Sequence, residues 1–465
     1  MAGSTARIAA ALRACLDAAD PRPCGLCVAT SGGLDSSVLL AQVARLRGEL
    51  ALPSVRALHV DHRLHPDSAA WAGRSAALAA RFGVPHEVRV VDARPPPGAS
   101  PEAHAREVRY AAIAAALHPG EMLLTAHHAD DQFEGVLLQW LRGGGLRAVA
   151  GMLPVRRFGA GWHARPLLGL TRAELAAEAG GAGLEWHEDP SNRDLRYDRN
   201  YLRHAVLPAI RARWPSAART VGRVAAQAAE ALAMEEEIAA ADLAMVADGA
   251  SVVVERLEWL PDARRRWVLR RWLRARGLPV PAESTLAALE RDAGRAAPDR
   301  VPCTRWSGAR VHRYRGRLYA EAESLAGAPL AAGAWPAGSV YPLGELGSLE
   351  LRAATGAGIA RARLGDGLEV IGRPDGGWFR PPGAAHRRPL RKWLQDRGVL
   401  PWRRTQLPLL ACDGEIVAIA DLSVAEGWVA GPGEDGWTVH WSGRPCVTAA
   451  DVSAVSLDAA GDATD

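Results

Sequence analysis

Residues 24–46 read CGLCVATSGGLDSSVLLAQVARL, and this stretch decides the fold class. The apolar run at 24–30 predicts a short buried strand, and apolar residues at helical spacing from Val38 to Leu46 predict a helix directly after it. The same alternation continues to residue 142. Further strands are expected at 55–62, 86–92 and 121–128, and further helices at 68–83, 102–117 and 130–142. This pattern predicts an α/β fold with a doubly wound parallel sheet, whose ligands bind at the carboxyl ends of the strands.

The turn at 31–36, SGGLDS (the SGGLDS loop), predicts a phosphate site. Its two glycines let the backbone approach an anion closely, and N–H groups at the helix start then point at it. A Walker A loop is excluded, because GxxxxGK[ST] is absent and Lys392 is the only lysine. A glycine-rich turn with a serine cap is the plainer alternative. The residues expected to bind the phosphates are Ser31, Gly32, Gly33, Leu34, Asp35 and Ser36.

A second polar cluster follows the fourth expected strand. Positions 127, 130, 131 and 134 are spaced i, i+3, i+4 and i+7, so they share a helix face. The three carboxylates of Asp130, Asp131 and Glu134 repel one another unless a cation joins them, and Mg²⁺ is the simplest such cation. We expect Asp35 and Asp131 to be its ligands. The alternative is that these carboxylates favour the amino end of a helix electrostatically, above all Glu134.

Two groups of arginines are candidates for binding anions. Arg106 and Arg109 lie at i and i+3 on one helix face, and could reach a phosphate or simply form a solvated surface. Arg199, Asn200 and Arg203 form an RNxxR pattern, and arginine forks suit both phosphates and nucleosides.

Composition is that of an ordinary folded protein. The 465 residues are 48% hydrophobic and 23% charged, with a net charge of +4, and six cysteines are too few for a disulfide scaffold. The N-terminus lacks a signal-peptide pattern and no long apolar run is present, so we expect a cytoplasmic, reduced protein without a membrane partner. Cys24 and Cys27 are expected to be buried thiols, because no second CxxC or histidine pair completes a metal site.

Several motifs, taken in order, resemble one family. SGGLDS resembles the pyrophosphate loop of the N-type ATP pyrophosphatases, and the remaining segments are similar to the tRNA(Ile)-lysidine synthases within that superfamily. The segments are LHVDHRL (58–64), Ala105-Arg106-Glu107 with Arg109-Tyr110, HHADDQFE (127–134), RPLLGLTRAEL (165–175), EDPSNRD (188–194), RNYLRH (199–204) and RPLRKWLQDRGVLPWRRTQLPLLACDGEIVAI (388–419). The family's usual threonine after Glu134 is Gly135 here, which removes any hydroxyl at that position.

The resemblance implies an enzyme and its substrates. Such an enzyme uses ATP with Mg²⁺ to join free L-lysine to the wobble cytidine of the tRNA(Ile) that has a CAU anticodon, through an adenylated base, and releases AMP and pyrophosphate. It implies that Asp35, His128 and Asp131 are catalytic, with His128 or a neighbouring carboxylate as the base, and that Arg106 helps to bind ATP. The expected tRNA or substrate contacts are Arg109, Arg199, Asn200, Arg203, Arg391 and Lys392. A homodimer is allowed for. The alternatives are a related tRNA-thiolating enzyme and a non-catalytic, nucleotide-dependent RNA-binding protein.

The same resemblance organises the chain into domains. An ATP pyrophosphatase domain with a Rossmann-like sheet is expected at 1–212, a mainly helical substrate- or tRNA-binding domain at 213–325, and a small mixed α/β tRNA-binding domain at 341–445. Residues 446–465 are expected to be a disordered tail, because they carry four aspartates, no basic group and no periodicity. Seven arginines at 264–276 surround an apolar stripe, and either face RNA or are solvated. The same two possibilities hold for the basic residues at 387–397.

Overall fold

The computed structural model describes residues 3–98, 101–188, 190–295, 301–325, 330, 332–336, 338–364, 367–374 and 376–455. The chain divides into two compact units, Met1–Met234 and Glu235–Asp465. The three-domain division stays a prediction, since the contacts separate the chain at a different place.

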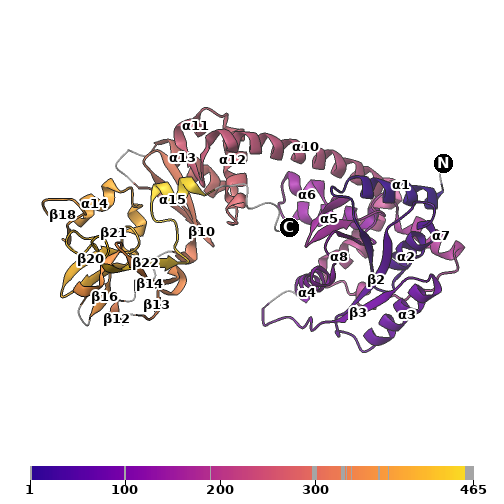
Figure 1. Ribbon diagram of the computed structural model, residues 1–465. Helices are drawn as coiled ribbons and strands as arrows, with labels where there is room; N and C mark the ends of the chain where they lie inside the picture. Colours follow the sequence, from indigo (N-terminus) through magenta and orange to yellow (C-terminus); the bar gives the residue numbers. More distant parts are fainter. Residues whose placement is uncertain are drawn as a thin grey trace. The chain divides into compact units, whose positions relative to one another are not determined.

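The first unit is built on a six-stranded sheet of order β3-β2-β1-β4-β6-β5 (Figure 1). Its strands are β1 (Gly25–Thr30), β2 (Ser54–Asp61), β3 (His86–Val90), β4 (Glu121–Leu124), β5 (Val155–Phe158) and β6 (Gly161–Ala164). Its helices are α1 (Ser4–Asp17), α2 (Leu34–Leu46), α3 (Ser68–Arg81), α4 (Pro101–Ala116), α5 (Ala129–Leu141), α6 (Leu146–Ala150), α7 (Arg172–Gly181), α8 (Asp198–Tyr201) and α9 (Leu207–Arg213), followed by α10 (Ala217–Val246), which contains the boundary between the units.

Both faces of this sheet are buried, as a doubly wound fold requires. Leu26 and Val28 of β1 belong to a core that includes residues of α1, α2, α3 and α7, whereas Cys27 packs with Ile113 of α4 on the opposite face. Successive side chains of a strand point to opposite faces, so β1 has to be apolar throughout. The predicted α/β class and parallel core are therefore confirmed. The hairpin of β5 and β6 adds an antiparallel edge strand that the sequence pattern did not reveal.

Two local expectations need correction. The fourth strand ends at Leu124 instead of residue 128, and Ala129 already begins helix α5. Cys27 is fully buried as expected, but Cys24 is exposed and donates its thiol to Pro119 O.

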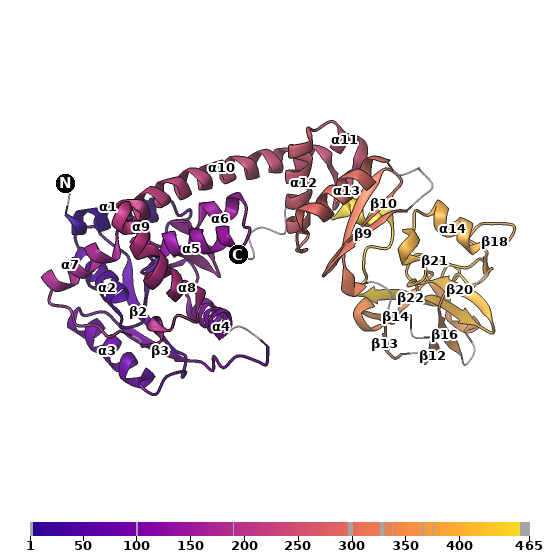
Figure 2. The same cartoon turned by 180° about the vertical axis from the view of Figure 1, so that it is seen from behind.

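The second unit combines helices with antiparallel sheets (Figure 2). Its first part contains α11 (Val254–Glu258), α12 (Asp262–Ala275), α13 (Glu283–Arg295), β7 (Ala247–Asp248), β8 (Ser251–Val253), β9 (Cys303–Trp306), β10 (Ala309–Tyr314) and β11 (Arg317–Ala322). The remainder contains β12 (Gly333–Trp335), β13 (Tyr341–Pro342), β14 (Ser348–Thr355), β15 (Ile359–Ala360), β16 (Leu368–Ile371), β17 (Trp378–Phe379), β18 (Arg388–Pro389), α14 (Leu390–Asp396), β19 (Leu409–Cys412), β20 (Glu415–Ile419), β21 (Ser423–Val424), β22 (Asp435–Ser442) and α15 (Ala449–Ala454). The sheet orders are β7-β8-β11-β10-β9, β12-β16-β19-β20-β21 and β13-β14-β22-β15, with the β17–β18 pair apart.

The arginines of α12 are engaged within the unit. Its apolar stripe is buried as expected, with Val268, Leu269, Trp272 and Leu273 in the core. The guanidinium groups around this stripe form ion pairs with carboxylates of α10 and α13, for example Arg271 with Glu236 at 3.1 Å. Most of this charge is therefore balanced by the protein itself, which neither sequence interpretation anticipated.

Part of the expected disordered tail is ordered. The hydroxyl of Thr448 accepts from the backbone of Asp451 and starts helix α15, while Val447 and Val452 are buried. A capped helix with apolar anchors can be as short as this one. Residues 456–465 lie outside the described part of the chain. Among the described helices, none is both long and apolar enough to cross a membrane.

Candidate active site

The SGGLDS loop is closed by its own serines. Ser31 N–H donates to Ser36 Oγ at 3.1 Å, and Ser36 Oγ donates to Gly33 O at 3.1 Å. Gly32 has φ +77°, a left-handed conformation that glycine adopts without strain. Helix α2 begins at Leu34, so the first N–H groups of a thirteen-residue helix have no partner within that helix and open toward the loop.

Buried polar side chains form hydrogen bonds with Thr30, the residue that precedes the loop. His59 Nδ1 is 2.9 Å from Thr30 O at the end of β1, and Ser75 Oγ donates to Thr30 Oγ1 at 2.6 Å. These groups are buried, and their hydrogen bonds hold the end of β1 in place. The position of the loop is thus determined by three different elements.

The sheet order brings the second polar cluster to this loop. The order reverses between β1 and β4, and the carboxyl ends of these neighbouring strands lead into the SGGLDS loop and into the start of α5. A crevice at such a reversal is where open α/β sheets bind ligands. Two segments nearly 100 residues apart therefore meet at one edge of the sheet.

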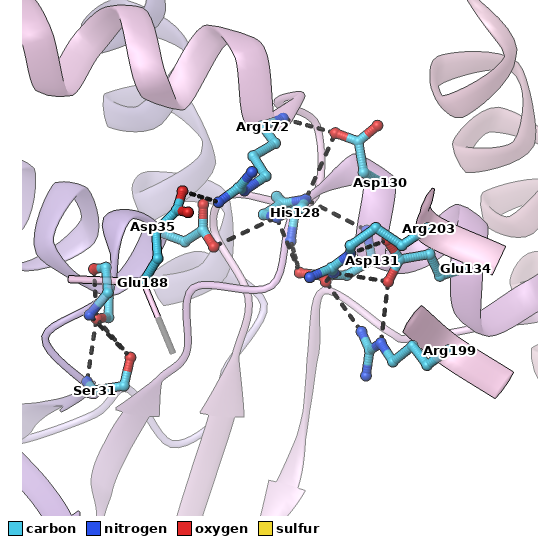
Figure 3. A network of polar contacts seen from close by, with 12 residues as sticks. Ser31, Asp35, His128, Asp130, Asp131, Glu134, Arg172, Glu188, Arg199 and Arg203 are labelled. Atoms are coloured by element: carbon cyan, nitrogen blue, oxygen red, sulfur yellow. Dashed lines mark hydrogen bonds and ion pairs between the residues drawn. The ribbon is translucent and has the colours of Figure 1, made fainter. Parts of the chain in front are cut away.

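His128 lies between the carboxylates of Asp35 and Asp131 (Figure 3). Its Nε2 atom is 3.6 Å from Asp35 Oδ2 and 3.4 Å from Asp131 Oδ2. Burial disfavours the charged imidazole, but the hydrogen bond to Asp35 and the surrounding carboxylate charges outweigh it and raise the pKa of His128. The structure thus brings together the three residues expected to be catalytic.

His128 also begins helix α5. Its Nδ1 atom accepts a hydrogen bond from Asp131 N–H at 3.4 Å, and Asp131 Oδ2 accepts one in return from His128 N–H at 3.1 Å. This reciprocal arrangement is a capping box.

Guanidinium groups join the carboxylates of α5. Arg199 and Arg203 each donate to Asp131 Oδ1 at 3.0 Å, and both also contact Glu134, whose side chain is 1% exposed. Asp130 pairs with Arg211 at 2.7 Å and also lies 3.8 Å from His128 Nδ1. The repulsion expected from the spacing is therefore relieved by arginine, and the predicted contacts of Arg199 and Arg203 with tRNA stay a prediction.

The other predicted basic residues are spread over the molecule. Arg106 and Arg109 both lie over the ring of Tyr110, at 5.0 and 5.4 Å from its centroid, and burial lowers the pKa of Arg109. The side-chain amide of Asn200 donates a hydrogen bond to Asp194 O at 2.9 Å, so this side chain stabilises the local fold. Exposed Arg391 and Lys392 lie on α14 in the second unit. Asp189 lies outside the described residues.

A buried hydrogen-bond chain behind His128 was not predicted. Arg165 donates to His163 Nδ1 at 3.3 Å, His163 Nε2 is 2.8 Å from Thr125 Oγ1, and the same hydroxyl is 2.8 Å from His127 Nδ1. Because the guanidinium can only donate, His163 carries its proton on Nε2. The pKa of His127 falls to about 3 and that of His163 to about 2, chiefly by burial. His163 lies on the unpredicted strand β6, and Arg165, although it begins the motif RPLLGLTRAEL, was given no role from the sequence.

Comparison with known proteins settles the family. The PP-loop domain model matches residues 6–210, the TilS substrate binding domain residues 253–319, and the TilS substrate C-terminal domain residues 368–441. The tRNA(Ile)-lysidine synthase of Methylococcus capsulatus is 38% identical over 422 residues, which cover 89% of this chain and 95% of that protein. The chain belongs to the tRNA(Ile)-lysidine synthase family. Proteins of the same name from Alkalilimnicola ehrlichii (42% identity, 88% of this chain and 92% of that protein) and Coxiella burnetii (34%, 89% and 92%) agree.

Within this family assignment, the PP-loop domain match contains the whole site described above. The SGGLDS loop, His128 and the arginines that pair with Asp131 all fall between residues 6 and 210. In the described part of the chain, no three His, Cys, Asp or Glu side chains are grouped to hold a metal ion on their own.

Proposed function

We propose that this enzyme activates the wobble cytidine of the tRNA(Ile) that has a CAU anticodon with ATP, and then joins free lysine to C2 of that base. The products are lysidine in the tRNA, AMP and pyrophosphate. The observation that carries the proposal is the meeting of the SGGLDS loop with Asp35, His128 and Asp131 at the reversal of the strand order. The family membership of the chain supports the same conclusion.

The chemistry needs two displacements. The C2 oxygen of cytosine is amide-like and leaves poorly, so it first attacks the α-phosphorus of ATP and pyrophosphate departs. The ε-amine of lysine then attacks C2, and the oxygen leaves with AMP. The first step depends on positioning and on neutralising the charge of the departing pyrophosphate.

The loop supplies the positioning. Backbone N–H groups of Gly32, Gly33 and Leu34 are the expected donors to the pyrophosphate, and the hydroxyls of Ser31 and Ser36, which are 3.1 Å apart, hold the loop closed. Arg106 is the expected contact with the remaining phosphate charge. The anticodon loop is single-stranded, so its first base can enter the site without melting a duplex.

Asp35 is the residue that fits a Mg²⁺ ion. Its Oδ1 atom is buried and has no hydrogen-bond partner in the described structure, whereas both oxygens of Asp131 are engaged by Arg199, Arg203 and the His128 backbone. A magnesium ion at Asp35 would neutralise charge on the pyrophosphate. Asp131 would be the weaker ligand of the two.

The amine must lose a proton before it attacks. His128 and the carboxylates beside it are the acceptors within reach of the loop. The exposed basic residues Arg391 and Lys392, in the unit with the TilS substrate C-terminal domain, are the expected contacts with tRNA phosphates.

Asp35→Ala tests the proposal. The wild-type chain, incubated with ATP, labelled lysine and total tRNA, should release AMP and pyrophosphate and place label in the RNA. The variant should lose at least about 100-fold in rate, the typical effect of removing a group that stabilises transition-state charge. Its circular dichroism and melting temperature should stay close to those of the wild type, because the side chain is partly exposed at the loop. Release of ADP and orthophosphate by the wild type, or sulfur transfer, would reject the proposal.

A further inference from the structure

Three aromatic rings are stacked beside the SGGLDS loop. His65 lies on one face of Trp71 with ring centroids 4.8 Å apart, and His187 lies on the other face at 4.6 Å. The interplanar angles are 18° and 14°, so the three rings are close to parallel. Trp71 belongs to α3, whereas His187 follows α7 by six residues, so the column joins two segments that are distant in sequence.

The His187 ring packs against Gly32 of the loop. A methyl group at Gly32 would come within 2.9 Å of His187 Cε1 and 3.0 Å of His187 Nδ1. The backbone N–H of His187 also donates to Gly32 O at 3.2 Å. The ring edge that carries Nδ1 is therefore turned toward the glycine that shapes the phosphate site, and both the stacking and the backbone hydrogen bond keep it there.

A pyrophosphate at this loop needs hydrogen-bond donors beyond those of the loop, because it carries several negative charges. The first unit contains no lysine, so a departing pyrophosphate has to be met by other donors. Two nearby side chains that could donate already contact carboxylates: His128 lies against Asp35 and Asp131, and Arg172 is 3.6 Å from Glu188. An imidazole fixed against Gly32 can add a hydrogen bond from nitrogen to a phosphate oxygen, and such bonds are strong when the acceptor is charged.

We infer that His187 is a further binding residue for the pyrophosphate group of ATP, and that Trp71 positions its ring. This inference rests on the proposed function, because it assigns the group at the SGGLDS loop as the β- and γ-phosphates. It adds a residue from outside the loop to the phosphate site. His65, on the other side of Trp71 from His187, is expected to make no contact with the ligand.

Pyrophosphate binding to the full-length protein, measured by calorimetry, tests this directly. His187→Phe keeps a ring against Trp71 and loses the nitrogen donors, whereas His187→Gln keeps a donor and loses the stacked ring. If His187 binds the phosphate, His187→Phe should weaken pyrophosphate binding about tenfold, as loss of a charge-assisted hydrogen bond does, and His187→Gln should weaken it less. His65→Phe, on the outer face of the same tryptophan, is the matched control and should bind pyrophosphate like the wild type.

The steady-state constants separate binding from a merely structural role. His187→Phe should raise KM for ATP and leave KM for lysine unchanged. Unchanged pyrophosphate binding in His187→Phe, or a larger defect in His187→Gln than in His187→Phe, overturns the inference. Absence of tRNA-dependent AMP formation by the wild type would instead reject the proposed function, while pyrophosphate binding would still decide the role of His187.

Discussion

At the scale of single residues, the site contains neighbouring histidines whose pKa values are shifted in opposite directions. His128 is surrounded by carboxylates, and its pKa is raised. His127 is its neighbour in sequence, but it is buried beside arginines and its pKa falls to about 3. Adjacent positions thus have pKa values shifted in opposite directions, because their side chains point into different surroundings.

The buried His163 should make folding sensitive to acid. Its folded pKa of about 2 lies below the value of the unfolded chain, so only the unfolded state takes up a proton as the pH falls below that unfolded value. Stability is therefore lost toward acid pH, by about 1.4 kcal/mol per pH unit for one such group. His163→Gln removes this proton and should lose about 2 kcal/mol less than the wild type between pH 7 and pH 5.

Urea unfolding at the two pH values measures this difference. His386→Gln is the control, because it removes an exposed imidazole from the second unit, and it should lose as much stability as the wild type. Equal losses in His163→Gln and wild type would show that His163 takes up a proton as readily in the folded protein as in the unfolded chain.

At the scale of elements, helix α5 serves both the fold and the site. His128 ends the loop after β4 and caps the helix, and the same ring lies between Asp35 and Asp131. On the helix itself, Asp131 and Glu134 are tied to Arg203, which lies in a π-helical turn at Leu202–Val206. A π turn inserted in a helix often marks a functional site.

His128→Asn separates these two roles. Asparagine is among the best N-cap residues, so the start of α5 should be kept, whereas the imidazole contacts with Asp35 and Asp131 are lost. We expect lysine incorporation to fall by at least about 100-fold, the usual contribution of an acid–base group, with a melting temperature close to that of the wild type. His128→Ala should lose activity and also about 1 kcal/mol of stability, because the cap is removed. Full activity in His128→Asn would limit His128 to capping the helix.

Sequence patterns predicted the elements that repeat and missed the contacts that depend on tertiary structure. The strand–loop–helix of the SGGLDS loop was readable, because apolar runs and glycines report local backbone structure. The spacing of Asp131 and Glu134 showed that charges would face each other, but it could not show that Arg199 and Arg203 would neutralise them. The stacking of His187 on Trp71 left no local pattern, since the two rings meet only after the sheet forms.

At the scale of the whole molecule, one buried carboxylate joins stretches of the second unit that the sequence assigned to separate domains. Glu321 on β11 accepts from Arg310 Nε at 2.5 Å and from Arg403 at 2.5 Å, and it lies 3.2 Å from His312 Nε2. The ring of His312 also stacks on Trp402, with centroids 4.0 Å apart, so an aromatic contact joins the same two stretches. Residues 213–325 and 341–445 are thus joined by a polar cluster that is less than 10% exposed at Glu321, Arg310 and Arg403.

Glu321→Gln should destabilise the junction between these two stretches. Two nearly buried guanidinium groups would lose their carboxylate, and breaking such a pair costs about 3–5 kcal/mol of unfolding free energy. Glu415→Gln is the control, because it removes only the exposed pair with Arg387 and should change stability by less than about 1 kcal/mol. Because Arg391 and Lys392 lie on the C-terminal side of the junction, Glu321→Gln should also raise KM for tRNA and leave KM for ATP unchanged. If the variant unfolds like the wild type, or if KM for ATP rises together with that for tRNA, the junction does not hold the proposed tRNA contacts Arg391 and Lys392 in place.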